Sequence, residues 1–157
     1  MFGTLDSSEI EQLINTQFIG RIGCHADGIT YVVPVSYAYD GTYVYCLGYE
    51  GKKIDMMRKN PKVCFQVDDT RNLANWQSVV AWGDYEEITN PSDRAKALQK
   101  LNDRKLPEVT SSTMKLSPQW PFIPDNLEDV KGIVFRIGLE QKTGRFEKTT
   151  SDNFFAS

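Results

Sequence analysis

Residues 18–48, FIGRIGCHADGITYVVPVSYAYDGTYVYCLG, decide the fold class because two Asp-Gly turns separate three β-rich runs. The turns are Asp27-Gly28 and Asp40-Gly41. An Asp-Gly pair between such runs is a strong local signal for a β-hairpin. We therefore expect an antiparallel meander of three strands. Its strands would cover residues 18–25, 30–39 and 42–48.

Pro34 is the unusual residue of the middle run. Proline has no backbone N–H to donate to a sheet, so it normally lies at an edge or a bulge. We therefore expect something other than a complete strand partner beside Pro34, either a ligand or a break in the sheet. Both alternating faces of residues 30–39 are largely apolar, which suits the wall of a barrel that is covered on its outside.

The next stretch, residues 45–61 (YCLGYEGKKIDMMRKNP), predicts a strand that runs directly into a short helix. Lys52 and Lys53 would lie in the first helical turn, where free N–H groups and the positive end of the helix dipole attract an anion. Lysines have the wrong charge for that position unless an anion neutralises them. We therefore predict a phosphate site at this helix start. The alternative is that both lysines are solvated residues on a charged helix.

The flanking sequence adds helices and further strands. Asp6 and Glu9 have the spacing of a capping box ahead of a helix over residues 7–16. Asn90-Pro91 begins a second helix that ends near Arg104. The other expected segments are a strand over 62–68, a polar loop over 69–75, a strand over 76–88 with a bulge at Gly83, a strand over 133–139 and a bend over 143–146.

Together these segments predict a mainly β protein, an antiparallel β-barrel of about six strands with flanking helices. We expect a single domain spanning residues 1–157. Residues 105–129 hold four of the seven prolines and are expected to form an irregular arm or lid. Residues 148–157 are expected to be a frayed tail.

Composition and motifs exclude several functions. A net charge of −3 argues against a general nucleic-acid-binding protein, and no apolar run is long enough for a membrane span. Three cysteines without a C-x-x-C pair, and an N-terminus without a signal-peptide pattern, lead us to expect a cytoplasmic protein with reduced thiols. His25 is the only histidine, which argues against a metal site and a catalytic triad. Glycine-rich nucleotide-binding motifs do not occur.

Five pieces of sequence, taken in order, form a recognisable set. They are YVVPVSY (31–37), Asp40-Gly41, GKK (51–53), NPKVCF (60–65) and WQSVV (76–80) with Gly83. This set resembles the pyridoxamine 5′-phosphate oxidase-related flavoproteins, and most closely the branch that includes the nitroimidazole-resistance proteins. The resemblance covers roughly residues 5–104, and more weakly the last strand to Phe146. It implies an FMN-binding split β-barrel that forms a homodimer with two FMN sites at the subunit interface.

Carried over by position, the resemblance implies a set of cofactor contacts. The strand residues Val33, Pro34, Val35 and Ser36 would lie along the flavin ring. Lys52 and Lys53 would bind the phosphate. Further contacts would come from Leu47, Gly48, Tyr49, Trp76, Gln77 and Ser78. Residues 105–129 would cross to the partner subunit and bring Trp120 near the ring, or would leave Trp120 in a groove of its own barrel.

Two departures from the family pattern bear on the reaction. The oxidases proper end in a signature with arginine and histidine that holds pyridoxal phosphate, whereas residues 136–146 contain no histidine. Oxidation of pyridoxamine phosphate is therefore not the expected reaction. Gly51 replaces a residue whose side chain hydrogen-bonds the phosphate, so backbone N–H groups would have to compensate.

The leading hypothesis is an FMN-dependent oxidoreductase in which reduced flavin passes a hydride or electrons to a small-molecule acceptor. No residue stands out as an acid or a base, so the catalytic residues stay unassigned. The alternatives are a flavin-binding carrier without turnover, and a cofactor-free or haem-binding split barrel that serves as an interaction domain. Neither nucleic acid nor a membrane is expected as a partner.

Overall fold

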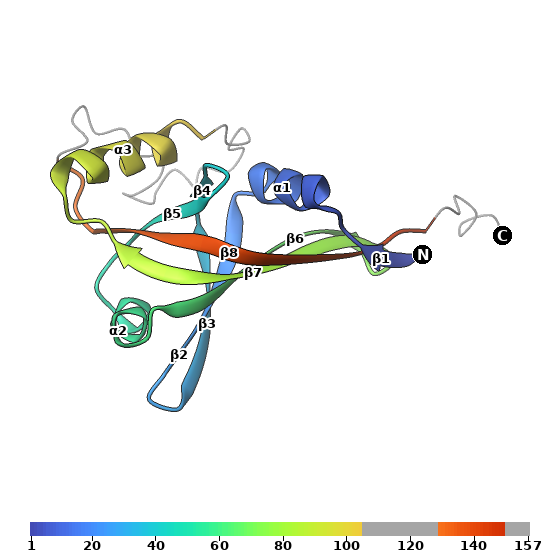
Figure 1. Ribbon diagram of the computed structural model, residues 1–157, viewed down its shortest axis with the longest axis horizontal. Coiled ribbons are helices and arrows are strands. Elements are labelled where there is room, and N and C mark those ends of the chain that lie inside the picture. Colours follow the sequence, from blue (N-terminus) through green and yellow to red (C-terminus); the bar gives the residue numbers. More distant parts are fainter. Residues whose placement is uncertain (105–128, 150–157) are drawn as a thin grey trace, which may run out of the picture.

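The computed structural model describes residues 1–104 and 129–149, which form one antiparallel sheet of eight strands and three helices (Figure 1). The strands are β1 (Phe2–Thr4), β2 (Ile19–Ala26), β3 (Ile29–Ser36), β4 (Ala38–Tyr39), β5 (Tyr43–Gly48), β6 (Lys62–Asn72), β7 (Asn75–Glu87) and β8 (Ile133–Glu147). The helices are α1 (Ser7–Thr16), α2 (Lys52–Lys59) and α3 (Pro91–Asn102). The expected mainly β architecture is confirmed, with eight strands in the described residues instead of about six.

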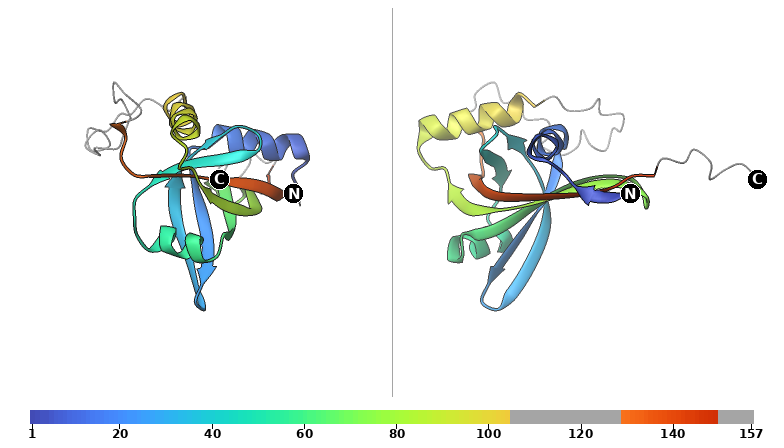
Figure 2. Two further views of the ribbon diagram at one scale, coloured as in Figure 1. Left: turned by 60° about the vertical axis from the view of Figure 1, so that its left-hand side comes forward. Right: turned by 45° about the vertical axis from the view of Figure 1, so that its right-hand side comes forward.

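The strand order in the sheet is β3-β2-β6-β7-β8-β5-β4, and β1 pairs with β8 outside this path. β3 and β4 therefore lie at the two ends of the sheet. The long β7–β8 pair crosses the molecule, with α1 and α3 on one side of it and α2 and the β2–β3 hairpin on the other (Figure 1). Two further views show the same division of the helices (Figure 2). None of the described helices is both long and apolar enough to cross a bilayer.

Over β3, β2, β6 and β7 the sheet has one buried and one exposed face. Direct neighbours on the buried face are Val33, Ile22, Phe65 and Ala81, and the last three are fully buried. Direct neighbours on the exposed face are Val32, Gly23, Cys64 and Trp82. Val32 is 61% exposed and Trp82 is 43% exposed. We call the side that carries this second row the outer face.

Both predicted Asp-Gly hairpins are confirmed, but residues 30–39 form two strands, β3 and β4, instead of the one predicted. Asp27 and Gly28 form the turn between β2 and β3 with φ angles of 52° and 75°, as an Asp-Gly hairpin requires. The chain then bends at Tyr37, so β5 forms the Asp40-Gly41 hairpin with the short β4 and pairs on its other side with β8, not with β3. Tyr37 fixes the bend because its buried side chain donates a hydrogen bond to the carbonyl oxygen of Ile14 at 2.6 Å.

Three other boundaries differ from the sequence prediction. β6 and β7 extend through the predicted polar loop at 69–75, because the polar residues of both strands pair across the hairpin. β8 continues to Glu147 without the predicted bend, and there it pairs with β7 and with the unpredicted β1. Lys148 donates its backbone N–H to the carbonyl oxygen of Met1, so its backbone is not frayed. The predictions for residues 105–128 and 150–157 lie outside the described residues.

Gly83 marks the irregularity that the sequence predicted, although the extra residue lies on the partner strand. Trp82 faces Gln141 and Gly83 faces Leu139, so Glu140 is the bulged residue of β8. A Cβ atom on Gly83 would lie 1.9 Å from the carbonyl oxygen of Gly138. β7 and β8 therefore approach more closely at this point than any side chain permits.

Replacement of Gly83 with alanine is expected to lower the free energy of unfolding by about 3 kcal/mol or more, because the two backbones must separate. Gly28→Ala is the control, since its φ of 75° strains an alanine but no atom lies within 4 Å. Its expected cost is about 1 kcal/mol. Equilibrium denaturation in urea measures both values. Equal costs for the two variants would show that the close approach at Gly83 does not constrain the sheet.

Candidate functional site

The start of α2 differs from the starts of the other two described helices. Asp6 caps α1 in a capping box, and the Asn90 side chain caps α3 by accepting from two backbone N–H groups. The N-cap of α2 is Gly51, which makes no side-chain cap hydrogen bond. The first N–H groups of α2 therefore have no side-chain acceptor at the cap, which leaves them available to an anion.

Two ammonium groups lie at this helix start. The Nζ of Lys52 is 5.0 Å from the centre of the Tyr31 ring, a cation–π contact with β3. The Nζ of Lys53 is 3.5 Å from the position that a Cβ on Gly48 would take. Within residues 1–104 and 129–149, neither lysine forms an ion pair with a carboxylate. The predicted phosphate site thus combines an uncapped helix start with two unneutralised cations.

Leu47, Gly48 and Tyr49 end β5 and lead into α2. Gly48 is buried, Leu47 is half-buried and Tyr49 is 46% exposed. The atoms nearest to a Cβ on Gly48 would be the Lys53 ammonium group and the ring of Phe135, each 3.5 Å away, so the Lys53 side chain ends beside Gly48. Leu47, Gly48 and Tyr49 therefore lie at the same end of β5 as the two lysines.

The predicted ring-lining residues Val33, Pro34, Val35 and Ser36 lie on β3, which pairs only with β2 among the described strands. Within residues 1–104 and 129–149 the other edge of β3 has no strand partner, so the expectation that Pro34 lacks a complete strand partner is confirmed for this part of the chain. Val35 is buried, Val33 is half-buried and Pro34 is exposed. A free edge presents alternate backbone N–H and C=O groups to a ligand.

Trp76, Gln77 and Ser78 begin β7 at the far end of the long β7–β8 pair, where β8 lies between β7 and β1 (Figure 1). The indole Nε1 of Trp76 donates to Glu147 at 3.1 Å. The hydroxyl of Ser78 accepts a hydrogen bond from Gln66 at 3.0 Å. These side chains are thus held by partners on neighbouring strands.

The strand pairing allows an estimate of the distance between Trp76 and the predicted phosphate site. Lys52 lies over Tyr31 of β3, which pairs with Cys24 of β2. The neighbouring residue of β2, Gly23, pairs with Cys64 of β6, so Cys64 marks the level of Lys52 on β6. Cys64 is six residues before Thr70, which pairs with Trp76. At about 3.3 Å per residue, Trp76 is roughly 20 Å from the predicted phosphate site. One chain therefore does not bring the Trp76 to Ser78 group to the lysines, and Trp120 lies outside the described residues.

Comparison with known proteins now decides the family. A family model described as pyridoxamine 5′-phosphate oxidase matches residues 6–146, which include α1 and every strand from β2 onward except the last residue of β8. The chain belongs to the pyridoxamine 5′-phosphate oxidase family. A curated but uncharacterized protein of Rhizobium meliloti is 28% identical to it over 149 residues, which cover 90% of this chain and 92% of that protein.

Solved structures support the same assignment. An FAD-binding protein from Mesorhizobium loti is 32% identical, with a TM-score of 0.72 over 94% of this chain and 99% of that one. A putative 5-nitroimidazole antibiotic resistance protein from Bacteroides thetaiotaomicron is 21% identical, with a TM-score of 0.70 over 93% and 87% of the two chains. The second likeness shows the fold alone. The expected split-barrel fold and family are therefore confirmed.

The buried thiols of this oxidase-family protein do not supply a nucleophile. Burial raises the pKa of Cys46 to about 12, although the nearby charge of Lys53 acts in the opposite direction. Burial also raises the pKa of Cys24. Both thiols are therefore protonated at neutral pH, and all three cysteines are unpaired. The described residues hold no cluster of three or more His, Cys, Asp or Glu side chains suited to a metal ion.

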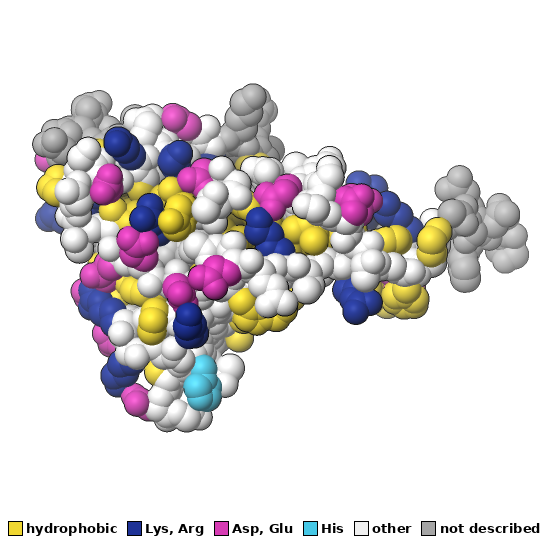
Figure 3. Space-filling model, in the orientation of Figure 1, with side chains coloured by type: hydrophobic (Ala, Val, Ile, Leu, Met, Phe, Trp, Pro, Cys, Tyr) yellow, Lys and Arg dark blue, Asp and Glu magenta, His cyan; other side chains and the backbone are white. Residues whose placement is uncertain are grey.

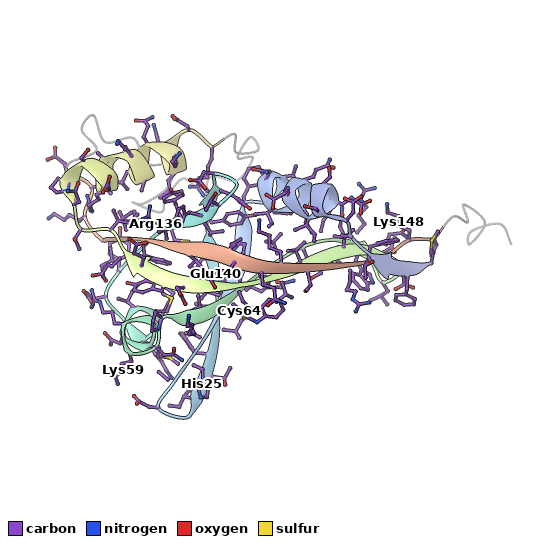
Figure 4. The ribbon with its side chains drawn as sticks, in the orientation of Figure 1. His25, Lys59, Cys64, Arg136, Glu140 and Lys148 are labelled. Carbon is purple, nitrogen blue, oxygen red and sulfur yellow. The ribbon has the colours of Figure 1, made fainter. Side chains whose placement is uncertain are left out.

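A groove of about 400 Å³ on the outer face was not predicted from the sequence. Val32, Cys64 and Trp82 line it together with His25, whose Nδ1 is 3.0 Å from the hydroxyl of Thr30. Hydrophobic side chains lie near His25 on this side of the molecule (Figure 3). Figure 4 labels His25, Cys64 and the bulged Glu140, which reach the groove from β2, β6 and β8. The groove forms because strands that are far apart in the sequence pair with one another.

Arg104 is a second feature that the sequence analysis missed. Its guanidinium donates to the hydroxyl of Ser36 and to the carbonyl oxygens of Tyr37 and Leu101, the last two at 3.1 and 2.7 Å. Burial lowers the pKa of Arg104. The side chain ties the end of α3 to the bend between β3 and β4. The available signal was a basic residue at the end of a predicted helix.

Ser36→Ala is expected to lower the free energy of unfolding by about 1–3 kcal/mol, because it removes one acceptor of the partly buried Arg104 guanidinium. Ser36→Thr keeps the hydroxyl and is the matched control. Urea denaturation of cofactor-free protein gives both values. If Ser36→Ala matters only when flavin is present, the hydroxyl serves the ligand and not Arg104.

Proposed function

We propose that the protein binds FMN, with the phosphate at the start of α2. Lys52 and Lys53 supply positive charge, and the N–H groups of an uncapped helix supply hydrogen bonds. The observation that carries this proposal is the meeting of these two features without a carboxylate partner for either lysine in the described residues. The cap also leaves room, because the nearest atom to a Cβ on Gly51 would be 3.9 Å away.

The flavin ring would then lie along the free edge of β3. The backbone groups of Val33 to Ser36 suit the polar edge of such a ring, because alternate N–H and C=O groups face outward along a strand edge. Leu47, Gly48 and Tyr49 would line the side nearer α2. These residues adjoin the lysines in one chain, which supports a ring and phosphate held as a unit.

Bound FMN supplies hydride and electron transfer, while the protein positions it and sets its electrostatic environment. We propose that the electrons pass to a small-molecule acceptor. A flavin carrier without turnover is the second candidate, and anaerobic reduction followed by addition of nitro-compounds or quinones separates the two. Repeated reoxidation identifies an enzyme. A single reoxidation without turnover identifies a carrier.

We also propose a homodimer with two FMN sites at its interface. Exposed Val32 and Trp82 give the outer face an apolar surface that suits a second copy. The Trp76 to Ser78 group is roughly 20 Å from Lys52 in one chain. A partner subunit would supply this group to the cofactor if the two outer faces meet.

Purified protein is expected to be yellow and to release FMN on denaturation, identified by its chromatographic mass. Release of FAD would instead follow the Mesorhizobium loti relative, which is named an FAD-binding protein. Replacing Lys52 and Lys53 together with alanine should weaken FMN at least about tenfold and leave riboflavin within about twofold, because riboflavin has no phosphate. Fluorescence titration of cofactor-free protein measures both affinities.

A matched control for the lysine pair replaces Lys96 and Lys100, two exposed residues of α3, which lies across the β7–β8 pair from α2 (Figure 1). This variant loses the same charge and should bind FMN like the wild type. A colourless protein that takes up no added flavin would contradict the proposal. Equal losses of FMN and riboflavin in the Lys52 and Lys53 variant would show that these lysines do not bind the phosphate.

Val32→Glu is expected to weaken the dimer at least about tenfold, because it places a charge in the proposed apolar contact. Ile29→Glu is the control, since Ile29 is 49% exposed on the same strand but on the opposite face. Analytical ultracentrifugation over a range of concentrations measures both association constants. A dimer that tolerates Val32→Glu as well as Ile29→Glu uses another surface.

A further inference from the structure

Glu50 is the acidic residue next to the proposed phosphate site. It immediately precedes Gly51, the N-cap of α2, and 65% of its side chain is exposed. A free carboxylate here would repel a phosphate and offset part of the charge of Lys52 and Lys53. Asp55 also lies in the first turn of α2, but further along the helix from the cap.

Arg58 forms an ion pair with the Glu50 carboxylate. Its Nη1 and Nη2 donate to the two carboxylate oxygens at 2.8 and 2.9 Å, which makes a bidentate pair. Arg58 belongs to the last turn of α2. The bridge therefore holds the residue before the helix start against the opposite end of the same helix.

The sheet fixes the guanidinium from its other side. The Nε of Arg58 donates to Glu87 at the end of β7 at 2.9 Å, and the hydroxyl of Tyr85 donates to the same oxygen at 2.8 Å. Hydrogen bonds with Glu50 and then Glu87 raise the pKa of Arg58. Arg58 thus joins β7, α2 and the loop before α2.

We propose that Arg58 is a positioning residue for the flavin phosphate, which it serves by offsetting part of the charge of Glu50 and holding this carboxylate away from the helix start. This inference rests on the proposed function. The side chains of Arg58 and Glu50 are 39% and 65% exposed, so the pair contributes little to folding stability. Its main effect is on the electrostatic potential at the start of α2. One uncompensated charge several ångströms from a phosphate changes its affinity by about three- to tenfold in a solvent-exposed site.

Arg58→Gln tests this role through cofactor affinity. FMN binding should weaken about three- to tenfold, and riboflavin binding should stay within about twofold, because the effect acts on the phosphate. Fluorescence titration of cofactor-free protein at low salt measures both. The loss for FMN should shrink at about 0.5 M salt, which screens exposed charges. Urea denaturation should show an unchanged free energy of unfolding.

Lys59→Gln is the matched control, because it removes the same charge from the same turn of α2. Lys59, which Figure 4 labels, pairs with Asp27 of the β2–β3 turn at 2.6 Å, whereas Glu50 pairs with Arg58. Its loss should change FMN binding by less than about twofold. Adding Glu50→Gln to Arg58→Gln should restore FMN affinity toward the wild-type value, since the released charge is then absent.

Three results would overturn the role assigned to Arg58. They are equal losses in Arg58→Gln and Lys59→Gln, a loss for riboflavin as large as for FMN, and no recovery on adding Glu50→Gln. Failure of the proposed function looks different. In that case the wild type prefers FMN no more than riboflavin, and the Lys52 and Lys53 double variant behaves like the wild type.

Discussion

The pairing of β7 with β8 is the interaction on which the rest of the molecule depends. The two strands are in register at twelve positions from Trp76 to Glu87, and they join the half of the sheet that ends at β3 to the half that ends at β4. Gly83 permits their close approach, and the bulge at Glu140 increases their local twist. The two halves curl together so that α2 reaches β3, as the contact of Lys52 with Tyr31 shows.

Local chemistry made part of this fold predictable. The Asp27-Gly28 turn, the Asp6 capping box and the edge position of Pro34 follow from backbone rules that need only a few neighbouring residues. The bend at Tyr37 was missed because it depends on a hydrogen bond to Ile14, which is distant in the sequence. Pairings of β1 and β5 with β8 were missed for the same reason, since no local pattern reports a partner that far along the chain.

Some residues of the candidate site could likewise be predicted from local sequence, and others depend on the fold. Lys52, Lys53 and Gly48 lie close together because the end of one strand and the start of one helix carry them within a few residues. Trp76 to Ser78 came from the family resemblance, and their distance from the lysines follows only once the register of β6 is known. The sequence alone did not indicate a role for Arg58, because a basic residue in the last turn of a helix is common. Its bonds to Glu50 and Glu87 depend on how α2 packs against the end of β7.

The free edge of β3 also has a consequence for how this protein behaves at high concentration. Among the described residues one edge of the eight-residue β3 lacks a strand partner, and such an edge is a template on which another chain can add a strand, with repeated addition leading to fibres. Pro34 interrupts that template because it offers no N–H at its centre. The same residue that weakens strand pairing at this edge is therefore expected to oppose aggregation of the protein.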